Sequence, residues 1–253
     1  MKTILLLISF LLVFNFAEAK IVAIDIGHFN IQGKQGATGA SGTPEVVYNK
    51  IVGEAVKTNL EEKNVSCFLI ENMDLRDRVK VANLWADIFV SIHHDSVSEN
   101  LVPFAYKFSG FSIFVSSNNT AYKDSLRLGK LVGSNLIKNG FYVALHHQGN
   151  KKRKYVLLDK NNGVYSGSVL TVLKETNIPA ILVECGVIKN MREEAWLELP
   201  EIRKKLVLSI STGIEEFFER WYMKPEPQKL VPDQPKKRQP IKKVKPKQSW
   251  VSA

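Results

Sequence analysis

Short runs of β-branched and aliphatic residues alternate along the chain with segments of helical spacing. The apolar runs predict strands over 21–27, 65–70, 88–92, 111–115 and 180–184, with a weaker extended signal over 155–158. Helical spacing and terminal signals predict helices over 45–62, 75–86, 124–139, 167–175 and 201–221. Strands that alternate with helices predict an α/β fold: a mainly parallel, twisted sheet in a single domain, with helices on both faces.

The start of the helix over 45–62 is marked by Thr43 and Pro44, because Thr is a good N-cap and Pro suits the first helical position. Glu45 therefore falls in the first turn. The helix dipole favours a carboxylate there even without a ligand, so the position alone assigns Glu45 no function. The residues expected on the buried face of this helix are Val47, Ile51, Ala55 and Val56.

The first residues differ in composition from the middle of the chain. Residues 1–19 combine Lys2, an apolar stretch and the small-x-small pattern Ala17-Glu18-Ala19, which predicts a secretory signal peptide cleaved after Ala19. A retained membrane anchor is the alternative, but the apolar run is shorter than the roughly 20 residues that a span needs. Since no second stretch is long enough, we expect no transmembrane segment in the mature protein, whose main domain covers 20–223.

The basic surplus is concentrated at the other end. Of the formal net charge of +10, residues 224–253 carry +7, together with six of the ten prolines. This composition predicts a disordered, basic Pro/Lys-rich tail. We expect no nucleic-acid partner, because the positive charge belongs to an appended segment of an exported chain. Two interpretations of the tail stay open: a solvated extension, or an electrostatic tether to an anionic envelope surface.

Cysteine is scarce for an exported chain, with only Cys67 and Cys185. A disulfide framework is therefore not expected to hold the fold together. Cys185 lies beside a candidate site residue, but a buried free thiol near a strand end is the favoured interpretation.

Candidate chemistry lies where these elements begin or end. His28, His93 and Glu184 each follow an apolar strand, and Glu45 opens a helix. Because ligands in open α/β sheets gather beyond the carboxyl ends of the strands, the fold is expected to bring the four residues together. Two imidazoles and a carboxylate are a known catalytic zinc set, in which water takes the fourth position. A further carboxylate beside the metal can move the proton.

Five segments in this order resemble the zinc-dependent N-acetylmuramoyl-L-alanine amidases of the third amidase family, and the resemblance spans roughly residues 21–221. They are Ile24-Asp25-Ile26-Gly27-His28; Pro44-Glu45; Arg78 with Ala82-Asn83; Ser91-Ile92-His93-His94-Asp95; and Pro179-Ala180-Ile181-Leu182-Val183-Glu184-Cys185-Gly186 with Asn190. Each segment alone is a weak signal, and together they are a strong one.

The resemblance implies that His28, Glu45 and His93 bind one Zn²⁺ per chain and that Glu184 is the catalytic acid/base. It implies a peptidoglycan substrate, cleaved at the amide between N-acetylmuramic acid and L-alanine of the stem peptide, for cell separation or wall remodelling. The short signal and the missing wall-binding repeats favour the periplasm of a Gram-negative bacterium over an extracellular location. The alternatives are a zinc peptidase acting within the stem peptide and a non-catalytic wall-binding module.

The chain departs from the family pattern at two places. Phe29 follows His28 where glycine is common, and His94-Asp95 replace a more usual small residue and Asn. None of these residues is an expected ligand, but they can reshape the substrate groove.

Five further residues are candidates for supporting roles. Asp25 is expected either to orient His28 or to bind backbone amides at the strand end, and Arg78 to brace loops rather than touch substrate. His94 is not expected to share a metal with His93, because adjacent strand residues point to opposite faces. His146 and His147 lie in a polar loop, where solvated residues are the default and substrate contact is the alternative.

Overall fold

The computed structural model describes residues 20–148 and 155–222. The predicted signal peptide (1–19) and basic tail (224–253) lie outside these residues. Among the described helices, none combines the length and apolar character needed to cross a membrane.

A seven-stranded mixed sheet forms the centre of the domain, in the order β2-β1-β3-β7-β4-β6-β5. The first four strands in this order are parallel neighbours; β4 is antiparallel to β7, β6 is parallel to β4, and β5 is antiparallel to β6. The strand bounds are β1 Ile21–Ile26, β2 Ser66–Ile70, β3 Ile88–Asp95, β4 Ser112–Val115, β5 Val156–Asp159, β6 Val164–Ser166 and β7 Ala180–Val187.

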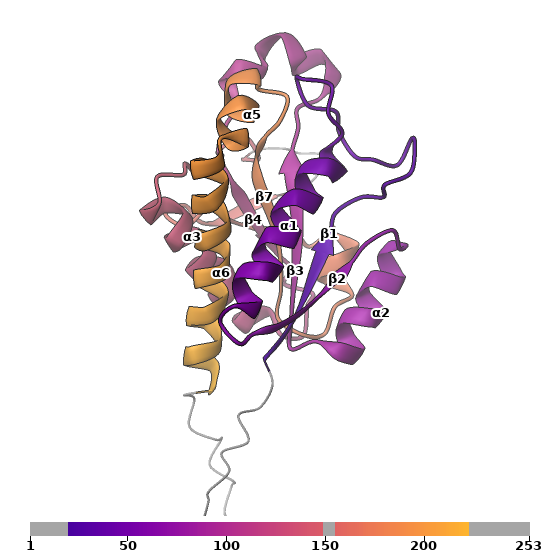
Figure 1. Ribbon diagram of the computed structural model, residues 1–253, viewed down its shortest axis with the longest axis vertical. Helices are drawn as coiled ribbons and strands as arrows, with labels where there is room; N and C mark the ends of the chain where they lie inside the picture. Colours follow the sequence, from indigo (N-terminus) through magenta and orange to yellow (C-terminus); the bar gives the residue numbers. More distant parts are fainter. Residues whose placement is uncertain (1–19, 149–154, 223–253) are drawn as a thin grey trace, which may run out of the picture.

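Helices cover both faces of the sheet (Figure 1). Helices α1, α3 and α6 pack together on one face, whereas α2 and α4 contact each other on the opposite face. The short α5 contacts β7, α6 and the 3₁₀ helix η1. The helix bounds are α1 Glu45–Glu61, α2 Leu75–Trp85, η1 Glu99–Lys107, α3 Tyr122–Lys138, α4 Thr171–Lys174, α5 Met191–Glu198 and α6 Pro200–Tyr222.

The core has two parts because successive strand residues point to opposite faces. In β1, Val22 and Ile24 belong to the cluster under α1, α3 and α6, while Ala23 belongs to the cluster under α2 and α4. In β3, Val90 and Phe89 divide in the same way. The α/β architecture, the mainly parallel sheet and the helices on both faces are therefore confirmed.

The structure differs from the sequence prediction in several elements. Strands β3 and β7 continue three residues beyond their predicted ends at 92 and 184. His93 therefore lies within β3 rather than after it, and Glu184 lies inside β7 rather than at its end. Three elements were not predicted: η1, which contains Pro103, the three-residue β6, and α5. Helix α5 gave no apolar signal because two of its three buried residues are glutamates.

The buried face predicted for α1 is partly wrong. Val47 and Ile51 are exposed, whereas Val46, Asn49 and Val52 face the sheet. The polar Asn49 lies in the middle of the buried face, so the apolar residues on that face did not form a continuous pattern in the sequence. The two cysteines are free thiols, and Cys185 is buried as expected.

Candidate active site

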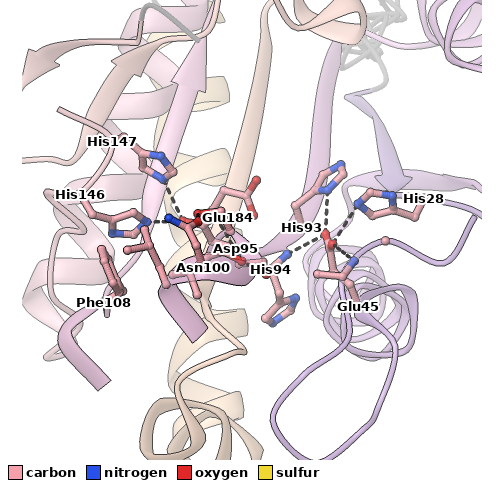
Figure 2. Close-up of a pocket in the computed structure, with 16 residues that line it drawn as sticks. His28, Glu45, His93, His94, Asp95, Asn100, Phe108, His146, His147 and Glu184 are labelled. Carbon is pink, nitrogen blue, oxygen red and sulfur yellow. Dashed lines mark hydrogen bonds and ion pairs between the residues drawn. The ribbon is translucent and has the colours of Figure 1, made fainter. Parts of the chain in front are cut away.

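The four residues that the sequence singled out converge on one cleft of about 880 Å³. His28 follows β1, Glu45 is the first residue of α1, and His93 and Glu184 are register partners on the neighbouring parallel strands β3 and β7. Figure 2 shows His28, Glu45 and His93 close together, with Glu184 beside them. The carboxyl ends of the central strands, together with the start of α1, therefore bring together side chains that are up to 156 positions apart in the sequence.

His28, Glu45 and His93 form a compact donor set. The Glu45 carboxylate bridges the two rings, with Oε2 2.9 Å from His28 Nε2 and Oε1 3.0 Å from His93 Nδ1. One potential ligand atom from each residue lies within 4.8 Å of the others. Two ring nitrogens and one carboxylate oxygen match a three-ligand zinc site that leaves a position open.

The environment of Glu45 favours its charged form. Burial alone raises the pKa of this carboxyl, but hydrogen bonds and charge interactions with His28 and His93 outweigh burial and hold the pKa well below its usual range. The backbone N–H of Ala37 also donates to Oε2 over 3.0 Å. Glu45 is therefore an ionised, fixed carboxylate, as a metal ligand must be.

Backbone conformation brings the donors this close. His28 has a φ of 69°, a left-handed conformation that redirects the chain at the end of β1. A Cβ at Gly27 would lie 2.3 Å from the His93 ring, and one at Gly36 would lie 2.5 Å from Glu45 Oε2. Only glycine leaves room for these side chains, so both positions belong to the construction of the site.

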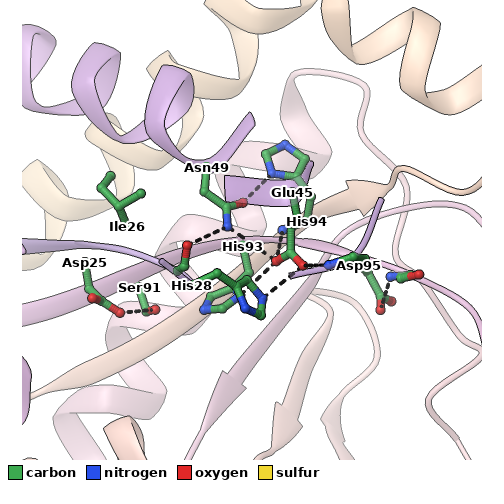
Figure 3. Close-up of polar contacts among 12 residues, drawn as sticks. Asp25, Ile26, His28, Glu45, Asn49, Ser91, His93, His94 and Asp95 are labelled. Carbon is green, nitrogen blue, oxygen red and sulfur yellow. Dashed lines mark hydrogen bonds and ion pairs between the residues drawn. The ribbon is translucent and has the colours of Figure 1, made fainter. Parts of the chain in front are cut away.

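His94 lies on the opposite side of β3 from His93 and is not a member of the donor set (Figure 3). Its Nδ1 lies 2.8 Å from Oδ1 of the buried Asn49, whose Nδ2 donates to the carbonyl of Gly27 over 3.2 Å. Because the Asn49 oxygen can only accept, the proton of the neutral ring is assigned to Nδ1. Burial lowers the pKa of His94 to about 4, so the ring is neutral near pH 7.

Asp25 and Arg78 form a buried ion pair behind the site, and the structure shows Asp25 bound to Arg78 and Ser91 rather than to the His28 ring. Arg78 in turn donates to the backbone carbonyls of Ile26 and His28. The guanidinium thus holds the backbone that positions His28, which is the kind of contact that a bracing role requires.

Replacing Asp25 with Ala is expected to destabilise the fold, because it leaves the buried guanidinium of Arg78 without its counter-charge. Removing one partner of a buried pair costs about 3–5 kcal/mol, measurable as a shift of the urea unfolding midpoint. Asp77→Ala is the matched control: its carboxylate pairs with Lys80 on the exposed side of the same helix, and such pairs contribute about 1 kcal/mol or less. Equal effects of the two substitutions would contradict the role given to Asp25.

His146 and His147 are not solvated loop residues. His146 Nε2 lies 2.7 Å from Asp95 Oδ2, and His147 Nε2 lies 2.9 Å from the same oxygen. Burial alone raises the pKa of Asp95, but the two imidazoles outweigh it and hold the pKa well below its usual range. All three residues line the same cleft as Glu184.

Sequence reasoning missed two residues that shape the site, Asn49 and Glu194. It named Asp95 only as a departure from the family pattern, without its contacts to His146 and His147. Asp95 lies two residues beyond His93 on the same strand, and this spacing was an available signal. Asn49 lies one helical turn after Glu45, which is also readable from sequence. Glu194 gave no such signal: it fastens the loop over 36–43 by accepting from the Ser41 N–H at 2.9 Å and the Tyr48 hydroxyl at 2.7 Å.

The sequence is similar to those of known proteins. The family model described as N-acetylmuramoyl-L-alanine amidase matches residues 22–216. An uncharacterised cell wall amidase of Bacillus anthracis is 27% identical over 219 residues, covering 81% of this chain and 36% of the relative. The amidase AmiC of Escherichia coli is 26% identical over 228 residues, covering 78% of this chain and 52% of AmiC. The chain thus spans between about a third and a half of the length of these two curated relatives.

Solved structures share the fold. The N-acetylmuramyl-L-alanine amidase Ami1 of Mycobacterium smegmatis superposes with a TM-score of 0.66 at 24% identity, covering 79% of this chain and 97% of Ami1. The catalytic domain of the amidase CwlV of Bacillus (Paenibacillus) polymyxa superposes with a TM-score of 0.61 at 25% identity, covering 79% and 98%. Since the family model matches most of the sequence, the chain belongs to the N-acetylmuramoyl-L-alanine amidase family.

Proposed function

We propose that this protein is a zinc-dependent N-acetylmuramoyl-L-alanine amidase that cleaves the amide between the lactyl group of N-acetylmuramic acid and L-alanine of the stem peptide. The observation that carries the proposal is the donor set of His28, Glu45 and His93 beside Glu184 in one cleft. Membership of the amidase family supports the choice of bond.

The residues present fit a zinc ion. His28, Glu45 and His93 would hold it, because their nitrogen and oxygen donors are the types that zinc binds and lie within reach of one ion. When bound, zinc supplies an activated water and a positive charge near the carbonyl oxygen of the substrate. The ionised Glu45 places negative charge between the two imidazoles and keeps their nitrogens directed toward one point.

Glu184 is assigned the proton transfers. Its position opposite His93 in the β3–β7 register places the carboxylate at the rim of the same cleft. In hydrolysis of the amide, the C–N bond breaks while a water oxygen joins the carbonyl carbon. The Glu184 carboxylate accepts the water's proton and delivers it to the leaving nitrogen, so the products are a lactyl carboxylate and a free L-alanine amine.

Digestion of purified sacculi tests this proposal. Mass spectrometry is expected to find glycan chains with free lactyl carboxylates and intact stem peptides that begin with L-alanine, and a chelator is expected to stop their release. Peptides cut within the stem would instead identify a zinc peptidase. Binding to sacculi without any product would identify a non-catalytic wall-binding module.

We also propose that the chain is exported and works in the cell envelope, with the periplasm favoured. The leader pattern of residues 1–19 supports export, and the two curated relatives described above are named as amidases, one of them a cell wall amidase. The basic segment over 224–253 is proposed as an electrostatic tether to an anionic envelope surface. Deleting it is expected to weaken binding to isolated walls at low salt, and unchanged binding would reject the tether.

A further inference from the structure

All five histidines of this chain line one cleft. His28 and His93 belong to the proposed zinc site, and His94 bonds to Asn49 on α1. The other two, His146 and His147, form a second group with Asp95. In the view of Figure 2, the two groups lie on opposite sides of Glu184.

The second group also has the geometry of a donor set. One potential ligand atom each from Asp95, His146 and His147 lies within 4.8 Å of the others. The backbone N–H of Ser96 donates to Asp95 Oδ1 over 2.7 Å, which turns Oδ2 toward the two rings. Both imidazoles direct Nε2 at this oxygen, so two nitrogens and one oxygen converge on a single point.

Hydrogen bonding alone leaves this cluster incomplete. His146 bonds to Asp95 Oδ2. His147 Nε2 lies 2.9 Å from the same oxygen, but within residues 20–148 and 155–222 this buried nitrogen has no partner in hydrogen-bonding geometry. The side chain of His147 is only 9% exposed. Since buried polar atoms are almost always satisfied, an unsatisfied ring nitrogen aimed into a donor set indicates a ligand.

Backbone hydrogen bonds and ring contacts position the two histidines. Their segment is tied to Phe111, just before β4, by backbone hydrogen bonds from Phe111 to Tyr142 and from Ala144 to Phe111, each 2.8 Å long. The Tyr165 hydroxyl donates to the Ala144 carbonyl over 2.6 Å, and the His147 ring packs edge-on against Phe114 and Tyr165. Ligands fixed in this way need little ordering when an ion binds.

The nitrogen and oxygen donors of Asp95, His146 and His147 indicate which metal ions this group would bind. Imidazole nitrogens suit zinc and its neighbours among the divalent transition metals, whereas calcium and magnesium prefer oxygen ligands. Because metal ligands bind in their deprotonated forms, one carboxylate and two imidazoles would together bring a charge of −1 to a divalent cation. Two histidines and one carboxylate form the same ligand set as the proposed first site, built from different elements.

We propose that Asp95, His146 and His147 bind a second divalent transition-metal ion of the zinc type. This inference goes beyond the proposed function, which needs one metal. It predicts a stoichiometry of two ions per chain and places a second positive charge in the substrate cleft.

Zinc content of the full-length, tag-free protein tests the proposal, after loading with Zn²⁺ and dialysis into metal-free buffer. The wild type is expected to retain two equivalents. His147→Gln and Asp95→Asn are each expected to lose one equivalent, and Asp77→Asn, on the exposed side of α2, is the matched control that keeps both. Glu45→Gln is expected to lose the other equivalent and keep the one at the second group.

Anomalous diffraction at the zinc edge from wild-type crystals provides a measurement that does not depend on how the variants fold. Peaks at both groups support the proposal. A single peak at His28, Glu45 and His93, with one equivalent in the wild type, would overturn it and leave the proposed function standing. A single peak at Asp95, His146 and His147 would support the second site and count against the proposed function.

Discussion

Replacing Glu184 with Gln is expected to lower kcat for release of stem peptides by about 10²–10⁴-fold, the usual contribution of a positioned acid/base. Glutamine keeps the size of the side chain but cannot accept the proton or hand it to the leaving nitrogen. Because Glu184 is outside both donor sets, the zinc content of the variant should equal that of the wild type. Turnover of sacculi and elemental analysis on the same preparation measure both quantities.

Glu198→Gln is the matched control for this substitution. It makes the same chemical change at an exposed position at the end of α5. Its turnover should stay at the wild-type level. If Glu184→Gln retains turnover similar to that of Glu198→Gln, Glu184 does not carry the proton and the mechanism proposed above is wrong.

Replacing Glu45 with Gln is expected to remove one zinc equivalent and nearly all activity. The carboxylate lies between His28 and His93, and its negative charge would attract and bind a cation held by these two rings. Loss of the several kcal/mol that a metal ion supplies corresponds to a loss of kcat of about a thousandfold. Metal content and turnover should therefore fall together, unlike in Glu184→Gln, where only turnover falls.

Glu54→Gln provides the control on the same helix, because Glu54 is exposed on α1 and pairs with Lys50 over 3.7 Å. It should change neither metal content nor turnover. A Glu45→Gln variant that keeps every zinc equivalent would contradict the ligand role of Glu45. Circular dichroism of the two variants checks that the helix is retained in both.

Sequence reasoning worked best where local patterns determine position. Apolar strands that run into His28, His93 and Glu184 place these side chains at the carboxyl edge of a parallel sheet, and the structure brings them together there. Glu45 was found from the helix start expected at Thr43 and Pro44. The helix does begin there, but Pro44 rather than Thr43 is the N-cap residue, and no side chain caps the helix. The fold class followed from the same alternation of strands and helices.

Contacts that depend on tertiary packing were not accessible from these patterns. His146 and His147 lie in an irregular segment, and only their attachment to the region before β4 brings them to Asp95, about 50 positions earlier. The buried glutamates of α5 resemble solvated charges in the sequence, because nothing local indicates the backbone amides that they bind, such as that of Gly110, which donates to Glu193 over 2.6 Å. Polar residues with distant partners are therefore the weakest part of sequence-based prediction here.

Because every histidine of the chain lines the same cleft, histidine signals report on this cleft in a spectrum. In a sample labelled only at histidine, each ring signal in a nuclear magnetic resonance spectrum originates from a residue that lines the cleft. Tautomers, protonation and metal loading become visible there without background from the rest of the molecule. Inhibitor screening could use those same resonances as a direct reporter of occupancy.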